Sequence, residues 1–251
     1  MRAIVVGIKF ASAALLIGAA LLVAIRASHS VAAVSGTPES ITAPAGQSAA
    51  GLKQAQFVGA GSCAARACHG NIALSPGRQW NSAYSIWMAN DPHAQSYAVL
   101  STNESQRMAT ALGIGDPTKA QRCLACHAAP VSQTQRNAAG PNADAILIDG
   151  VGCEACHGAA ENYLAAHTMR GWEQLGDARY SAKFGMKNTA DIDARAKVCV
   201  GCHVGQPDAD GKPWRDVNHD LIAAGHPRLN FDFAAYMATL PPHWNTEKNP
   251  Q

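Results

Sequence analysis

All eight cysteines of the 251-residue chain fall into four pairs, and a histidine directly follows the second cysteine of every pair. Three pairs have two residues between the cysteines, and the first pair has four. The four motifs are Cys63–Cys68–His69, Cys123–Cys126–His127, Cys153–Cys156–His157 and Cys199–Cys202–His203. Any fold of this chain must present four copies of one chemical arrangement, and no other sequence feature constrains it as much.

The string C-x-x-C-H is the attachment signature of haem c. Two thiols add to the two vinyl groups on one edge of the porphyrin, and the adjacent histidine is carried under the ring, where its imidazole binds the iron. We therefore predict thioether links from all eight cysteines to four haem c groups. The predicted proximal iron ligands are His69, His127, His157 and His203.

Other interpretations of the cysteines explain less of the pattern. A single C-x-x-C is also typical of a thioredoxin-like redox pair or half a zinc site, and cysteines of exported chains often form disulfides. None of these requires a histidine after the second cysteine four times. At the first site, Cys63 to Cys68, a disulfide or a haem attached through one thioether is the alternative, although a longer loop still reaches both vinyl groups.

Histidines outside the motifs supply candidates for the far side of each iron. His29 lies in an N-terminal apolar segment, and the surplus that remains favours ligation of the irons by two histidines. Methionine is the other common sixth ligand, but the methionines have the spacing of core residues. The candidate distal ligands are His93, His167, His226 and His219, whereas His243 is expected at the surface.

Local sequence explains how His93 would be presented. Asp91 is a good N-cap and Pro92 suits the first helical position, so His93 would lie in the first turn of a short helix. Before it, Trp80, Tyr84 and Trp87 have helical spacing, which suits packing against a porphyrin or ordinary core packing.

The other candidates have different local settings. His167 follows His157 by ten residues, and if one helix joins them they are about 15 Å apart, so His167 must serve another iron. Gly225 and Pro227 stop any helix around His226 and expose its ring on a turn. His219 is a ligand candidate with two alternative roles, as a propionate partner or a helix cap.

The N-terminus indicates export. Arg2 and Lys9 precede an apolar stretch over residues 10–25, and small residues follow at 30–33. We predict that residues 1–33 are a secretory signal, with an uncleaved membrane anchor as the alternative. Either one places the remaining chain in the periplasm or outside the cell, with a membrane tether possible in the second case.

Composition divides the rest of the chain into two parts. Residues 34–56 are rich in Ser, Thr, Pro, Ala, Gly and Gln and are predicted to be a flexible linker, and residues 57–251 are the predicted tetrahaem domain. Removing the basic residues Arg2, Lys9 and Arg26 leaves 17 basic against 18 acidic residues. Haem propionates would make the protein more acidic still, which argues against nucleic acid as a partner.

The expected fold is mostly α and loop-rich, a multihaem cytochrome fold organised around four covalently bound haems with little β structure. Aromatic residues make up only 6% of the chain, which is low unless cofactors fill the core. The string Ser101-Thr-Asn-Glu104 predicts a capping box that opens a helix to Leu112, which Gly113 ends. A second helix is expected over 229–240, before Pro241.

The sequence resembles the tetrahaem cytochrome c-554 family over roughly residues 57–244. The resemblance rests on four motifs in series, His93 between the first two, and ligand-like histidines after the last. It implies a multihaem fold in which one haem is often five-coordinate and electrons come from a hydroxylamine-oxidising partner. The longer first motif departs from the simplest pattern, although tetrahaem cytochromes with such a spacing are known.

The resemblance also implies a distal pairing. By analogy, His93 would serve the third haem, His226 the first and His167 the fourth. No histidine lies between residues 128 and 156, so the second haem is the one whose sixth ligand is least determined, with His219 or an open site as options.

The function predicted from these features is electron transfer between redox protein partners through closely spaced haems, with no catalytic residue. The alternative is a multihaem oxidoreductase acting on a small nitrogen or sulfur species at a five-coordinate haem. A third possibility is a sensor or assembly subunit of a membrane redox complex.

Overall fold

The structure is a computed structural model that describes residues 54–73, 78–132, 135–136, 143–207 and 214–240. All of these belong to one contact unit, Ser40–Gln251. The predicted signal or anchor over 1–33, almost all of the predicted linker, and two histidines, His29 and His243, lie outside the described residues.

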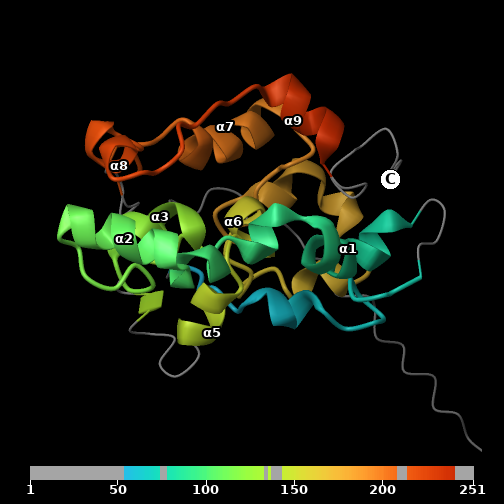
Figure 1. Ribbon diagram of the computed structural model, residues 1–251. Helices are drawn as coiled ribbons and strands as arrows, with labels where there is room; N and C mark the ends of the chain where they lie inside the picture. Colours follow the sequence, from blue (N-terminus) through green and yellow to red (C-terminus); the bar gives the residue numbers. More distant parts are fainter. Residues whose placement is uncertain (1–53, 74–77, 133–134, 137–142, 208–213, 241–251) are drawn as a thin grey trace, which may run out of the picture. The chain divides into compact units, whose positions relative to one another are not determined.

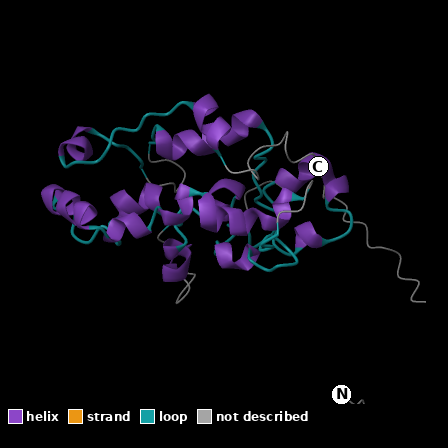
Figure 2. Cartoon of the chain, turned by 45° about the vertical axis from the view of Figure 1, so that its right-hand side comes forward, coloured by secondary structure: helices purple, strands orange, loops and turns teal. Residues whose placement is uncertain are grey.

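The described chain consists of short helices joined by loops (Figures 1 and 2). The α-helices are α1 (Ala83–Asn90), α2 (Asn103–Leu112), α3 (Gln121–His127), α5 (Ala143–Ile148), α6 (Cys153–His157), α7 (Ile192–His203), α8 (His219–Ala223) and α9 (Phe233–Thr239). The 3-10 helices are η1 (Ala60–Cys63), η2 (Gln79–Ser82), η3 (Pro92–Gln95), η4 (Ala98–Ser101), η6 (Ala166–Thr168) and η7 (Glu173–Tyr180). Extended pairing within the described residues is limited to one bridge, between Gln206 and Arg215. The expectation of a mostly α, loop-rich fold is confirmed.

Side-chain caps define where several helices begin. Asp191 accepts a hydrogen bond from the Ala194 N–H at the start of α7, and Asp232 accepts one from Ala235 at the start of α9. At α2 the cap is Thr102, one residue later than the predicted Ser101, because the Thr102 hydroxyl accepts the Ser105 N–H. Gly113 ends α2 in a left-handed conformation, as predicted.

Two predicted helices are shorter in the structure. His157 and His167 do not share one helix, since α6 ends at His157 and His167 lies in the separate η6. The break is at Gly158, which has a φ of 89° and whose Cα lies so close to Gly185 that an added Cβ would be 2.3 Å from the Gly185 carbonyl oxygen. Near the C-terminus, α9 begins only at Phe233, after its cap, and Leu229 precedes it.

The apolar core of the described residues is divided into small clusters. One is made of Leu100, Leu124, Ala128 and Leu147; a second of Ala160, Tyr163, Trp172 and Phe184; and a third of Ala129, Val131 and Ile146. Each cluster lies beside at least one cysteine motif in sequence rather than forming one continuous core. The polypeptide therefore holds the motifs together with little apolar burial of its own.

A buried carboxylate joins the start of the described chain to the third cysteine motif. Glu154, in α6, is only 4% exposed and accepts hydrogen bonds from the backbone N–H groups of Val58, Gly59 and Ala160 at 2.7–3.1 Å. Burial raises the pKa of this carboxyl more than its hydrogen bonds lower it. Asp149 makes a parallel link by accepting the Ala60 N–H at 2.7 Å.

We expect Glu154→Ala to lower the free energy of unfolding by about 3 kcal/mol, because three buried N–H donors lose their acceptor. Denaturant unfolding followed by circular dichroism measures this. Glu104→Ala is the matched control, since Glu104 is exposed in the first turn of α2 and its removal should cost below about 1 kcal/mol. Equal losses in the two variants would contradict the role given to Glu154.

Candidate haem sites

Three of the four cysteine motifs form the last turn of a helix. The helices α3, α6 and α7 end at His127, His157 and His203, respectively. Within such a turn, residues i and i+3 share a face, so the two cysteines of a motif lie on the same side of the helix. All eight cysteines are free thiols in the polypeptide and are partly buried.

The first motif reaches a similar closure through a loop. Cys63 ends η1, and the four residues between the two cysteines turn back so that the His69 N–H donates to the Cys63 carbonyl at 3.3 Å. Gly70 makes this turn possible, because an added Cβ there would lie 1.8 Å from the Ala64 carbonyl oxygen. The longer spacing therefore still brings His69 back to the first cysteine of its pair.

Three predicted distal histidines each lie opposite a motif histidine. The ring centres of His69 and His167 are 6.2 Å apart with parallel planes, at 5°. Those of His127 and His226 are also 6.2 Å apart, at 82°, and those of His93 and His203 are 6.0 Å apart, at 85°. Six of the described histidines thus form three pairs at nearly equal spacing.

This spacing is the one that a shared metal ion requires. A metal–imidazole bond is about 2 Å long and the ring centre lies about 1.1 Å behind the bonded nitrogen, so two imidazoles on opposite sides of one iron have centres about 6.2 Å apart. Ordinary ring contacts reach the same distance, as Tyr163 and His167 do at 6.1 Å, so the distance is compatible with a shared iron, and the attachment motif that supplies one histidine of each pair is what points to haem. The residues present therefore fit haem iron.

Hydrogen bonds fix which ring nitrogen faces the partner. In four paired histidines the Nδ1 atom lies 2.7–3.0 Å from a backbone carbonyl oxygen. The pairs are His69 with Trp80, His127 with Ser96, His167 with Tyr163, and His226 with Pro227. A carbonyl only accepts, so each Nδ1 carries the proton and each Nε2 keeps its lone pair. This is the usual second shell of a metal-bound histidine.

His93 is held in a different way. Its Nδ1–H donates to the Asp91 carboxylate at 2.7 Å, and its backbone N–H donates to the same oxygen at 3.0 Å. Asp91 is therefore the cap of η3, as predicted, and also a ring partner. Its hydrogen bond raises the pKa of His93, whereas burial lowers the pKa values of His127 and His203.

The structure gives a different pairing from the one implied by family resemblance. His167 faces the first motif rather than the fourth, His226 the second rather than the first, and His93 the fourth rather than the third. His167 does face a motif other than that of His157, and the two residues lie in separate helices with the break at Gly158 between them.

The remaining predicted residues have separate positions. His219 is exposed at the first position of α8 and belongs to none of the three pairs. His157, at the third motif, has its Nδ1 3.4 Å from the Thr189 hydroxyl, and its carbonyl accepts the Lys187 N–H. The methionine candidates include Met88 and Met169, whose side chains are exposed.

Thiols of different motifs meet, which shows which sites are neighbours. The Cys63 and Cys153 thiols are hydrogen-bonded, and so are those of Cys126 and Cys202. These bonds and burial raise the pKa of Cys153 and Cys126, while Cys202 has its pKa lowered to about 6. The first motif therefore lies beside the third, and the second beside the fourth.

A third short distance connects the first-and-third pair of motifs with the second-and-fourth pair. Burial raises the pKa of the Cys156 thiol to about 12, and this thiol is close enough to the fourth motif to interact electrostatically with Cys199 and Cys202. The third motif therefore lies near the fourth.

Sequence reasoning missed the residues that support the sites. Glu154 was not singled out although an acid within an attachment motif is a visible signal, and Asp91 was assigned only its cap. The buried Arg195, whose Nε donates to the Thr189 carbonyl at 2.7 Å, lies in α7 one turn before Cys199. Nothing in the sequence around Arg195 indicates that this side chain is buried.

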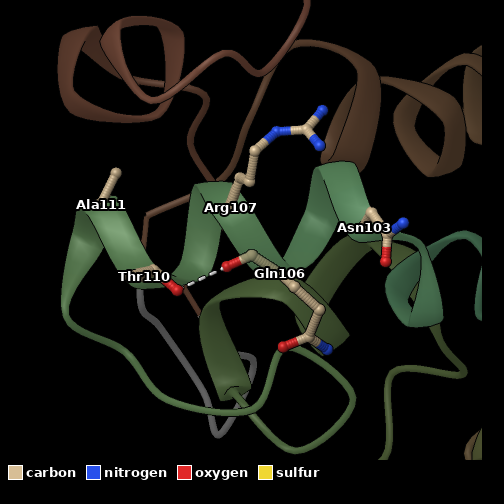
Figure 3. Close-up of a pocket in the computed structure, with 5 residues that line it drawn as sticks. All are labelled: Asn103, Gln106, Arg107, Thr110 and Ala111. Atoms are coloured by element: carbon tan, nitrogen blue, oxygen red, sulfur yellow. Dashed lines mark hydrogen bonds between the residues drawn. The ribbon is translucent and has the colours of Figure 1, made fainter.

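One surface hollow of the described residues is separate from these sites. It lies on the exposed side of α2, and Figure 3 shows the Thr110 hydroxyl donating to the Gln106 carbonyl on that helix. Its lining residues are Asn103, Gln106, Arg107, Thr110 and Ala111. It contains no cysteine or histidine and is open to solvent, so it adds nothing to the haem sites.

Comparison with known proteins supports the chemistry of the site. Residues 62–158, which include the first three motifs and His93, match the family described as cytochrome c554 and c-prime. Comparisons with curated proteins and with solved structures give no match. In the described part of the chain, none of the helices has the length and apolar character needed to cross a membrane. Over residues 62–158 the chain therefore resembles the cytochrome c554 and c-prime family, and this resemblance supports a c-type cytochrome with an electron-transfer role.

Proposed function

We propose that the protein carries electrons between redox proteins through four haem c groups, held in the order first, third, fourth, second. When bound, each haem supplies a reversible one-electron couple of its iron. The observation that carries the proposal is the set of three histidine pairs with ring centres 6.0–6.2 Å apart. Two imidazoles at one iron occupy both axial positions, which suits electron transfer rather than binding of a substrate.

The order of the sites rests on the contacts between thiols. A cysteine that forms a thioether fixes the edge of its haem, so cysteines in contact hold neighbouring haem edges. The hydrogen-bonded pairs Cys63–Cys153 and Cys126–Cys202, together with the electrostatic proximity of Cys156 to Cys199, support one uninterrupted series. The first and second sites are its two ends, where an electron enters and leaves.

Axial ligation is proposed for seven histidines. His69, His127, His157 and His203 are the proximal ligands, and His167, His226 and His93 are the distal ligands of the first, second and fourth sites. We further propose that the protein works outside the cytoplasm, because residues 1–33 have the pattern of an export signal or anchor. Its partners are then exported or membrane-bound redox proteins.

Haem content tests the proposal directly. The pyridine haemochrome of the purified holoprotein should give four haem c per chain, and Cys63→Ser with Cys68→Ser together should give three. The reduced protein should bind carbon monoxide at no more than one haem, because three irons have both axial positions filled by histidine. A colourless protein, or carbon monoxide binding at several haems, contradicts the proposed function.

Removing one distal histidine should open one identified site. The angle between the two imidazole planes shapes the ferric electron paramagnetic resonance (EPR) spectrum, so the parallel pair at the first site and the near-perpendicular pairs at the second and fourth should give different signals. We expect His167→Ala to remove the parallel-plane signal and to make one haem high-spin. His226→Ala should remove a perpendicular-plane signal instead, whereas His219→Ala, the control, should change neither.

The opposite result would restore the pairing implied by family resemblance. If His226→Ala abolished the parallel-plane signal and His167→Ala left it unchanged, the three ring pairs would not be ligand pairs. The haem count would still stand in that case.

A further inference from the structure

The acceptor behind His93 differs in kind from the acceptors behind the other paired rings. Among the six paired histidines in the described part of the chain, His93 is the one whose ring donates to a carboxylate, at 2.7 Å from Asp91. The Asp91 side chain has no exposed area at all, while 32% of the His93 side chain is exposed. A buried negative charge therefore stands directly behind one axial ligand.

The backbone keeps this carboxylate in place. The Asp91 oxygen that accepts the ring also accepts the backbone N–H of His93, as the cap of η3. Pro92 follows with its fixed φ, and the Ala94 N–H donates to the Asp91 carbonyl. The same oxygen accepts both bonds, so turning the carboxylate away from the ring would also cost the cap of η3.

A carboxylate acceptor changes the ligand electronically. It draws the Nδ1 proton more strongly than a carbonyl does and so makes Nε2 a more basic ligand, which favours ferric over ferrous iron. Its charge acts in the same direction, because a buried anion stabilises the more positive oxidation state across poorly polarisable surroundings. Both effects lower the reduction potential of the iron that His93 binds.

We propose that Asp91 is a positioning residue that gives the fourth haem the lowest reduction potential of the three sites with paired histidines. The inference rests on the proposed function, in that His93 and His203 must bind one iron. The reaction concerned is the uptake of one electron by ferric iron to give ferrous iron, with the electron supplied by the donor protein or, in the test, by a chemical reductant. No bond forms or breaks.

Spectroelectrochemical titration of the holoprotein tests the proposal. Asp91→Asn keeps an oxygen that can accept the ring N–H but removes the charge. At a fixed applied potential we expect the ratio of ferrous to ferric iron at the lowest-potential step to rise at least tenfold, which is a shift of 59 mV for one electron. The other steps should move less.

Asp149→Asn is the matched control, because it removes a half-buried carboxylate that accepts a backbone N–H, that of Ala60, rather than an imidazole. It should leave the lowest step within a factor of three in the same ratio. An unchanged lowest step in Asp91→Asn, or an equal shift in Asp149→Asn, would overturn the proposal.

A measurement on the unaltered protein keeps the test decisive if Asp91→Asn does not fold. The His93–His203 planes are 85° apart and the His69–His167 planes 5° apart, so their ferric EPR signals differ. During stepwise reduction the last of the paired-histidine signals to disappear should be a perpendicular-plane signal. Disappearance of the parallel-plane signal last would overturn the proposal whatever the variant does.

The same titration separates this inference from the proposed function. Four haems with resolved reduction steps but no effect of Asp91 would remove only the role of Asp91. A protein that shows no reducible haem would remove the proposed function as well.

Discussion

The pairing of imidazoles across about 6 Å is the constraint on which the rest of this structure depends. Each pair joins segments far apart in the sequence: His69 with His167, His93 with His203, and His127 with His226. The links interleave, so none can form without drawing the others together. An iron bound by both members of a pair would act as a cross-link that closes a long loop, and such a link restricts the unfolded chain much as a disulfide does.

The small apolar core is consistent with a chain that cross-links through iron would hold together. The described residues bury small separate apolar clusters of three or four residues, and many large apolar side chains, including Trp80 and Trp214, are about half exposed. A chain that relied on its own apolar burial would need a larger continuous core. Covalently attached porphyrins would supply the missing apolar surface, and their attachment would then be part of folding, as metal binding is in small metal-dependent domains.

Local features were predictable from the sequence, and long-range features were not. The motifs, the Asp91 cap, the end of α2 at Gly113 and the end of the helix before His226 depend on neighbouring residues, and the structure has each of them. The pairing of distal histidines depends on how distant segments meet, for which one sequence contains no local signal. The condition that one helix joins His157 and His167 is not met, because Gly158 is a point where two backbone segments touch, and such a contact has no local signal.

Asp91 shows why a correct local prediction can still miss function. The N-cap prediction required only that its carboxylate accept the backbone N–H of His93, and this is observed. The same oxygen also reaches the ring of His93, and that contact matters because His203 lies on the other side of the ring. One short stretch thus sets both the helix geometry and the chemistry of the ligand.

In the proposed order the fourth site is interior, between the third and the second, so a low reduction potential at this site places an energy barrier between the two ends of the series. Each electron would then have to cross this barrier from a reduced haem on one side to an oxidised haem on the other, rather than follow a continuous downhill path.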